Sequence, residues 1–203
     1  MIIFVTALLV SLLGSFFYLY SKGYNRFSRD KVPVIIGDGR GYYSYLPYYF
    51  IKWQDIPFER LTSSSSFLDQ TGNKYNIGES LLILPFFLIA HLLSFIFNYP
   101  VDGYSYFYQV FAGLSGLFYG FSGILILRKV LKRSFSEKIT LLTLAAITFG
   151  TNLFNYMTSN SLFSHAFSFF LFALLLYYTP IYFDKPKSLK RTAIIALIFG
   201  MII

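Results

Sequence analysis

The residues best suited to chemistry stand together near the start of a long polar segment, in the run Gly37-Asp38-Gly39. Glycines on both sides of an aspartate let the backbone take unusual torsion angles and let a ligand approach the carboxylate. A carboxylate held among aromatic rings is a reasonable general base, so Asp38 is the candidate catalytic residue. A solvated turn aspartate is the alternative, and the local sequence does not separate the two.

Two basic residues of the same polar segment are candidate ligands for a phosphate group. Arg40 follows Asp38 by two residues, and Lys74 stands shortly before the apolar stretch Leu81–Phe97. Cationic side chains bind phosphate oxygens through charge-assisted hydrogen bonds. Ordinary snorkelling of long basic side chains to lipid headgroups is the alternative for both residues.

The segment from Tyr42 to Trp53 holds seven aromatic side chains. Tyr and Trp favour the boundary between membrane and water, where the ring is buried and its polar edge stays wet. Tyr42, Tyr43 and Tyr45 are therefore candidate substrate-contacting residues, with ring faces on which a ligand can stack. An aromatic belt that only anchors a loop is the simpler alternative.

The chain has two histidines, and we assign them different roles. His165 stands at one end of the apolar stretch Leu162–Phe183, where an ionisable group is a functional candidate by default. We therefore add it to the candidate substrate-contacting residues. His91 lies in the middle of a short apolar stretch, and we expect it to be a structural histidine.

The composition identifies the class of protein. Of 203 residues, 56% are hydrophobic, 22% are aromatic and only 13% are charged, whereas a soluble domain is about 45–50% apolar and about 25% charged. The sequence therefore predicts an all-α polytopic membrane helix bundle. The absence of cysteine excludes disulfides, thiolate metal sites and cysteine nucleophiles.

Stretches without Asp, Glu, Lys or Arg mark the expected spans. We expect transmembrane helices over 2–20, 107–127, 139–156 and 162–183, and the start of a further, truncated one over 192–203. Within 107–127, small residues recur every four positions at Ala112, Gly116 and Gly120. Such a stripe lets another helix approach closely.

Most of the net charge of +8 lies in two short loops. Residues 128–138 carry five Lys or Arg against Glu137, and residues 184–191 carry four against Asp184. The positive-inside rule places both loops in the cytoplasm. Because the charge reports orientation in this way, we predict no nucleic-acid partner.

The stretch Leu81–Phe97 decides where the polar segment before it lies. If it crosses the membrane, residues 21–80 are cytoplasmic, which their eight Lys and Arg favour. If it does not cross, residues 21–106 form one external loop and Met1 lies inside. Seventeen helical residues cover about 25 Å of a hydrocarbon core of about 30 Å. The residues alone leave both arrangements open.

Three segments carry a resemblance to a known superfamily: GDGRGYYSYLP, KYNIGESLLILPFFLIAH and TNLFNYMTSNSLFSHAFSFF. They resemble uncharacterised bacterial relatives of the GT-C membrane glycosyltransferases. That superfamily includes the protein O-mannosyltransferases and the aminoarabinose transferase of lipid A, and the chain is similar to its N-terminal part. The resemblance covers essentially the whole chain.

The resemblance implies that the helix over 81–97 is juxtamembrane, which selects the arrangement with an external loop over 21–106. By motif position it makes Asp38 the catalytic carboxylate and gives Lys74 and Arg40 to the donor phosphate. Gly39 stands where the family has a second acidic residue, and His165 stands at a further acidic position. These departures leave a divalent metal possible but unsupported, and the sequence does not identify a cofactor.

The function that follows is an inverting GT-C type glycosyltransferase, which moves a sugar from a polyprenyl-phosphate donor to a lipid, glycan or protein acceptor. We expect it at the external face of a cell membrane, in a multi-pass protein of the bacterial inner membrane. A non-catalytic membrane scaffold, or a lipid-binding or transport protein, is the alternative. Spans free of Asp, Glu, Lys and Arg count against ion-coupled transport.

Overall fold

The computed structural model describes residues 2–24, 34–51, 73–184 and 188–202, and these residues form helices and turns without any β-strand. In chain order the helices are α1 (Ile2–Tyr24), α2 (Gly37–Tyr43), α3 (Tyr45–Phe50), α5 (Ile77–Ile96), α6 (Tyr106–Leu131), α7 (Glu137–Gly150), α8 (Leu153–Thr158), α9 (Ser164–Asp184) and α10 (Leu189–Ile202). The predicted all-α helix bundle is therefore confirmed for the described part of the chain.

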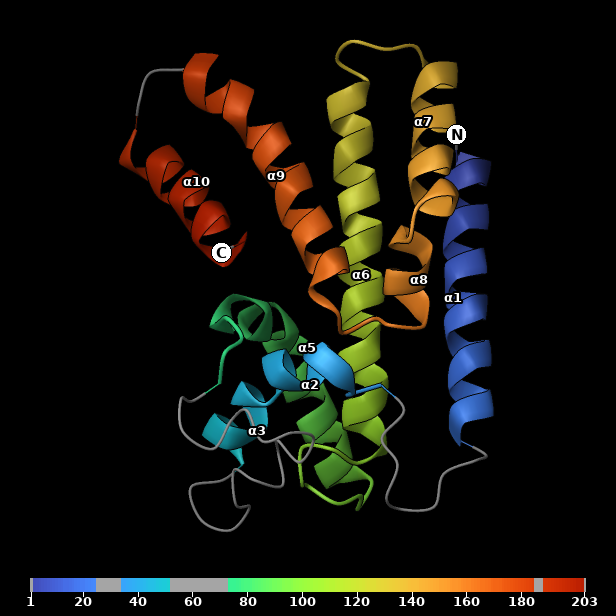
Figure 1. Cartoon of the computed structure of the whole chain (residues 1–203), viewed down its shortest axis with the longest axis vertical. Helices are drawn as coiled ribbons and strands as arrows, with labels where there is room; N and C mark the ends of the chain where they lie inside the picture. Colours follow the sequence, from blue (N-terminus) through green and yellow to red (C-terminus); the bar gives the residue numbers. More distant parts are fainter. Residues whose placement is uncertain (1, 25–33, 52–72, 185–187, 203) are drawn as a thin grey trace.

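Helix α6 is the centre of the bundle, and α5, α8 and α9 pack along it (Figure 1). Its predicted stripe of small residues is buried and in close contact. A Cβ atom at Gly116 would lie 1.8 Å from the carbonyl oxygen of Ser161, and one at Gly120 would lie 2.5 Å from Cγ of Met157. The stripe thus receives α8 and the turn that leads into α9.

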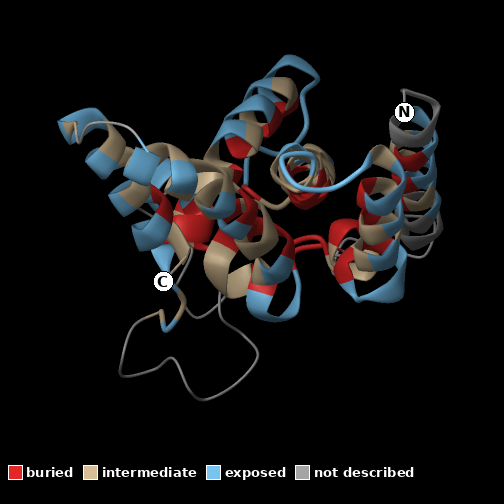
Figure 2. Cartoon of the chain, turned by 90° about the horizontal axis from the view of Figure 1, so that it is seen from above, coloured by how far each residue is buried: buried red, intermediate tan, exposed pale blue. Residues whose placement is uncertain are grey.

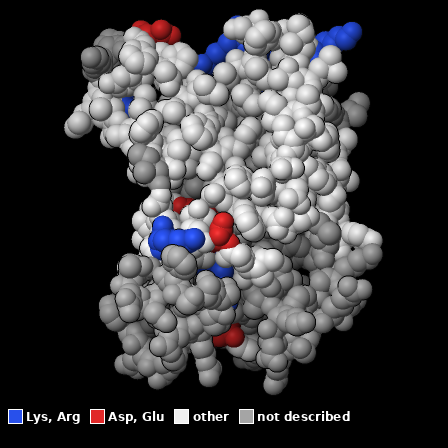
Figure 3. Space-filling model, viewed as in Figure 1, with Lys and Arg blue, Asp and Glu red and all other residues white. Residues whose placement is uncertain are grey.

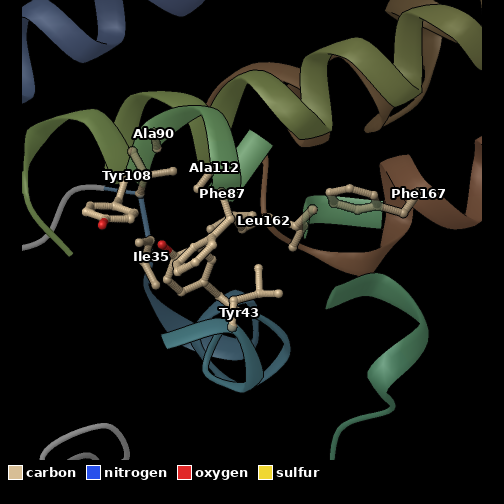
Figure 4. Packing of buried hydrophobic residues seen from close by; sticks show 11 residues of the cluster. Ile35, Tyr43, Phe87, Ala90, Tyr108, Ala112, Leu162 and Phe167 are labelled. Carbon is tan, nitrogen blue, oxygen red and sulfur yellow. The ribbon is translucent and has the colours of Figure 1, made fainter. Parts of the chain in front are cut away.

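Two clusters of buried apolar side chains hold the helices together, and buried positions line the inner faces of the bundle (Figure 2). One cluster joins α1, α6, α7 and α8 through residues such as Leu12, Leu117 and Met157. The other joins α2 to α5, α6 and α9, and Tyr43 and Phe87 lie at its centre (Figure 4). The second cluster positions the short helix that carries Asp38.

Three of the described helices, α5, α6 and α9, are long and apolar enough to cross a membrane. Large apolar side chains also remain on their outer surfaces, as Leu92, Phe118 and Leu176 show with more than half of each side chain exposed. Such surfaces are costly in water and stable in lipid. The chain is therefore a membrane protein.

The two ends of the bundle differ in charge. The connection from α6 to α7 and the end of α9 lie at one end, together with the start of α1 (Figure 1). Helices α2 and α3 lie toward the other end, and α5 stays in that half of the molecule. Basic side chains stand out at the first end (Figure 3).

The structure divides the segment 139–156, predicted as one span, into α7 and α8. The backbone of Thr151 is extended, with φ −124° and ψ 177°, so the helix ends there. The Thr151 hydroxyl donates to the Ile147 carbonyl at 2.7 Å and accepts from the Leu153 backbone N–H at 3.2 Å. This side chain competes with the helical hydrogen bonds and starts a new helix.

Of the predicted loop 21–80, residues 25–33 and 52–72 lie outside the described residues.

Replacing Gly116 with alanine should destabilise the protein, because the new Cβ would overlap the Ser161 backbone at 1.8 Å. Overpacking of this kind costs about 1–3 kcal/mol, so the thermal midpoint in detergent should fall by roughly 5 °C. The matched control is Gly14→Ala in α1, where nothing lies within 4 Å of the added atom. Equal midpoints for the two variants would contradict the close packing of α6.

Candidate active site

Helix α2 begins at Gly37, whose φ of +54° turns the chain into the helix. Two of its glycines lie against the turn before α9. A Cβ atom at Gly37 would lie 3.1 Å from the Phe163 ring, and one at Gly39 would lie 2.6 Å from the Leu162 carbonyl oxygen. Side chains at these positions would push α2 away from the bundle. The glycines on both sides of Asp38 therefore serve close packing, and the Asp38 side chain itself is exposed.

The carboxylate of Asp38 meets a phenol from a distant part of the chain. The hydroxyl of Tyr75 donates a hydrogen bond of 2.6 Å to Oδ1 of Asp38. The ammonium group of Lys74 lies over the Tyr75 ring, 4.9 Å from its centroid. The ring of Tyr42 lies 4.7 Å from the same ring, between centroids. A carboxylate, a phenol and a cation thus meet at one place on the surface.

A second set of hydrogen bonds ties the segment before α5 to α2 and α3. The side-chain amide of Asn73 donates to the Gly41 carbonyl at 2.8 Å. The hydroxyl of Tyr45 donates to the Tyr75 carbonyl at 2.6 Å. The Ser80 hydroxyl donates to the Tyr42 carbonyl. Because the two segments are joined at several points, Lys74 and Asp38 are held on the same side of the molecule.

The phenol of Tyr75 is hard to ionise. Burial raises its pKa first, and the hydrogen bond and negative charge of Asp38 raise it further, with Tyr42 adding to the effect, to about 12. Both Asp38 contributions favour the neutral phenol, because a phenolate would lose the hydrogen bond and face the carboxylate. Tyr75 is therefore a hydrogen-bond donor throughout the neutral pH range.

The predicted site residues separate into groups. Asp38, Lys74 and Tyr42 gather around Tyr75, as described above. Tyr45 is half-buried and contacts the site through its hydroxyl, which holds the Tyr75 carbonyl. Arg40 is half-buried on α2, and its positive charge acts on the phenol of Tyr104. Arg40 thus belongs to the same short helix as Asp38 and acts electrostatically on Tyr104.

Tyr43 was predicted to contact substrate, and its side chain is fully buried. Its hydroxyl donates to the Gly103 carbonyl at 2.6 Å, and its ring packs on Phe87 with 5.9 Å between centroids. Burial, and then the nearby phenols and Asp102, raise its pKa well above the ordinary value. With no exposed ring face, Tyr43 fastens α2 to the core and is left out of the proposed contact surface.

The two histidines have different surroundings. His165 is exposed in the first turn of α9, and its ring lies 4.0 Å from the ring of Tyr156. His165 comes directly after the turn whose residues contact Gly37 and Gly39. Its ring packs on the ring of Tyr156, and no contact with Asp38 is seen among the described residues. Nδ1 of His91 lies 2.7 Å from the Tyr108 hydroxyl, as expected for a structural histidine.

The sequence reasoning missed two residues of this region, Tyr75 and Glu79. Glu79 stands in the first turn of α5, and its side chain is only 6% exposed. Neither carboxylate oxygen has a hydrogen-bond partner among the described residues. An acidic residue in a first helical turn is a recognisable signal, because it complements the helix dipole. Nothing in the order of residues showed that Tyr75 would meet Asp38.

Among the described residues, charged side chains are few outside the basic end of the bundle. On the face in Figure 3, a small group of oppositely charged side chains lies at mid-height, below a largely uncharged surface. In the described segments 34–51 and 73–105 the charged residues are Asp38, Arg40, Lys74, Glu79 and Asp102. No three His, Asp or Glu side chains of the described residues are grouped so as to hold a metal ion.

Comparison with known proteins gives no relative: no family model, no curated protein and no solved structure matches the chain. The fold and the site therefore define the class by themselves. The chain is an all-α membrane protein, and its described residues bring a carboxylate, a phenol and an ammonium group together at one place on the surface.

Replacing Asp38 with asparagine should lower the pKa of Tyr75 from about 12, because the negative charge that opposes its ionisation is removed. The pKa should stay above the ordinary value of the same residue in a solvated peptide, since burial is the largest single cause of the shift. The difference can be read by ¹⁹F NMR titration with 3-fluorotyrosine at position 75 in both chains. Asp102→Asn is the control, because Asp102 accepts hydrogen bonds from Tyr104 and Ser105 instead. An unchanged titration in Asp38→Asn would contradict the contact.

Proposed function

We propose that the chain is an integral-membrane glycosyltransferase that moves a sugar from a polyprenyl-phosphate donor to an acceptor hydroxyl at the external face of the membrane. The observation that carries the proposal is the meeting of Asp38, Lys74 and two aromatic rings at one exposed place. A base, a cation for phosphate and stacking faces for a sugar are what such a transfer needs.

The surface beside the site suits a lipid-linked donor. Helix α5 begins two residues after Tyr75, and apolar side chains such as Leu81, Leu88 and Leu92 are about half exposed along it. A prenyl chain can lie on this apolar surface while its phosphate stays near Lys74. Because the lipid chain and the phosphate need opposite environments, a site at such a boundary serves both.

The reaction itself requires little from the protein beyond position and charge. The acceptor oxygen attacks the anomeric carbon as its proton passes to the Asp38 carboxylate. The bond between the anomeric carbon and the phosphate oxygen breaks, and the lipid phosphate leaves with the electron pair. The configuration at the carbon is inverted. Lys74 stabilises the negative charge that grows on the leaving phosphate.

Arg40 is the second candidate for the donor phosphate, and its side chain is less exposed than that of Lys74. It is half-buried and its charge acts on Tyr104 beneath α2. We therefore assign the main phosphate contact to Lys74, whose side chain is exposed. Tyr42 and His165, both accessible, remain the proposed contacts for the sugar and the acceptor.

Orientation in the membrane is part of the proposal. The basic connection from α6 to α7 and the end of α9 lie at one end of the bundle with the start of α1, and α2, which carries Asp38, lies in the other half (Figure 1). The positive-inside rule then puts the site on the external side. We therefore propose a multi-pass protein of the bacterial inner membrane with α2, α3 and α5 in the first external loop. Helix α5 is long and apolar enough to cross a membrane, and in this proposal it stays on the external side.

A lipid-binding membrane protein without catalytic activity is the second candidate. It is favoured by the Tyr75 hydrogen bond, which already occupies one oxygen of Asp38. In that case Asp38 would fasten the segment before α5 to α2, and Lys74 would bind a lipid phosphate without any transfer.

Replacing Asp38 with asparagine should abolish transfer, because asparagine cannot accept the proton of the acceptor hydroxyl. Purified protein in nanodiscs would be incubated with polyprenyl-phosphate hexose and a panel of hydroxyl acceptors, and released polyprenyl phosphate measured by mass spectrometry. We expect a loss of at least about a hundredfold, since general base catalysis contributes roughly 10²–10⁴-fold. Asp102→Asn should keep the activity. Transfer by Asp38→Asn at the normal rate would eliminate the assignment.

Replacing Lys74 with glutamine should weaken the binding of sugar-free polyprenyl phosphate by roughly tenfold, the effect of losing one charge-assisted hydrogen bond. Affinity would be measured with the lipid in nanodiscs at low and high salt, and the difference between the two chains should shrink as salt rises. Lys138→Gln, an exposed lysine at the opposite end, is the matched control. Equal affinities for the Lys74 and Lys138 variants would remove Lys74 from the phosphate site.

A further inference from the structure

The Asp38 carboxylate is held on one side and open on the other. Oδ1 accepts the hydrogen bond of the Tyr75 hydroxyl at 2.6 Å. No described residue donates to Oδ2, and the side chain is exposed. A base works best when a third group fixes its orientation and one acceptor atom faces the substrate. The geometry at Asp38 has this form.

Tyr75 is itself fixed from several directions. Its backbone carbonyl accepts from the Tyr45 hydroxyl at 2.6 Å, and its backbone N–H donates to Oδ1 of Asn73 at 3.1 Å. Its ring lies directly over Gly41, where a Cβ atom would come within 2.0 Å of ring atom Cδ2. A tyrosine held at backbone and ring is a stiff support for the group that it contacts.

We propose that Tyr75 is a positioning residue, which anchors Oδ1 of Asp38 and thereby presents Oδ2 to the acceptor hydroxyl. The catalytic part of this inference rests on the proposed function, and the anchoring does not. During transfer the acceptor proton passes to Oδ2, while the Tyr75 proton stays on the phenol and keeps its bond to Oδ1. Because the pKa of Tyr75 is about 12, the anchor persists over the neutral pH range.

Chemical labelling tests the anchor without any transfer assay. A water-soluble carbodiimide with glycinamide modifies exposed carboxyl groups, and mass spectrometry of the full-length protein's peptides gives the rate at Asp38. Tyr75→Phe should raise this rate several-fold, since Oδ1 loses its partner. Gly41→Ala should do the same by displacing the ring while keeping the hydroxyl. Unchanged labelling in both variants would overturn the proposal.

Two matched controls separate the anchor from general loosening of the fold. Tyr99→Phe removes an exposed tyrosine hydroxyl whose ring contacts are with Tyr106 and Phe107. Gly14→Ala adds a methyl group where nothing lies within 4 Å. Both should label Asp38 at the wild-type rate. Equal labelling increases in these controls and in Tyr75→Phe would also overturn the proposal.

Kinetics test the catalytic consequence. With polyprenyl-phosphate hexose in nanodiscs, Tyr75→Phe should lower kcat by roughly tenfold to a hundredfold, the usual effect of misplacing a reacting group, and change KM by less than about twofold. A higher KM at unchanged kcat would make Tyr75 a binding contact and overturn its positioning role. If the wild-type chain turns over no donor while labelling still responds, the proposed function fails and the anchoring of Asp38 stands.

Discussion

The site depends on how closely one short stretch of backbone, Ser161–Phe163, lies against three glycines. Gly116 of α6 faces the Ser161 carbonyl, and Gly39 and Gly37 of α2 face Leu162 and the Phe163 ring. The contacts at Gly116 and Gly39 are too short for a side chain at the glycine position, and a Cβ atom at Gly37 would need the Phe163 ring to shift. The stretch therefore fastens the helix that carries the candidate base to the central helix of the bundle, and buried Ser161 and Leu162 exclude solvent from the joint.

Beyond this contact, α2 combines a buried face that packs on the core with an exposed face that carries Asp38. Tyr43 fills the core beneath α2, while Asp38 on the same helix reaches the surface. The segment before α5 supplies Lys74 and Tyr75, and its hydrogen bonds to α2 and α3 keep both in place. The exposed side chains of Asp38 and Lys74 therefore stand on a buried, closely packed support.

Several features were predictable because they depend on composition or on short repeats. The excess of apolar residues indicated a helical membrane bundle, and the small residues at Ala112, Gly116 and Gly120 indicated close packing on α6. The break at Thr151 was not predicted, because the stretch 139–156 was identified as one span by its lack of charged residues. Gly150, Thr151 and Asn152 interrupt its apolar run, and the Thr151 hydroxyl bonds to the Ile147 carbonyl where the helix ends. The burial of Tyr43 was not predicted either, because neighbouring tyrosines in one run look alike in sequence.

The sequence by itself determined the class of the protein and the difference in charge between the two ends of its helices. Apolar helices are stable in lipid, and basic loops favour the cytoplasmic side, however the helices pack against one another. The sequence also singled out Asp38 and Lys74 as residue types fit for the proposed chemistry. Only the tertiary structure decided that Tyr75, thirty-seven residues from Asp38, holds its carboxylate. A contact over that separation depends on how α2, α5 and the turn before α9 pack, which no local pattern encodes.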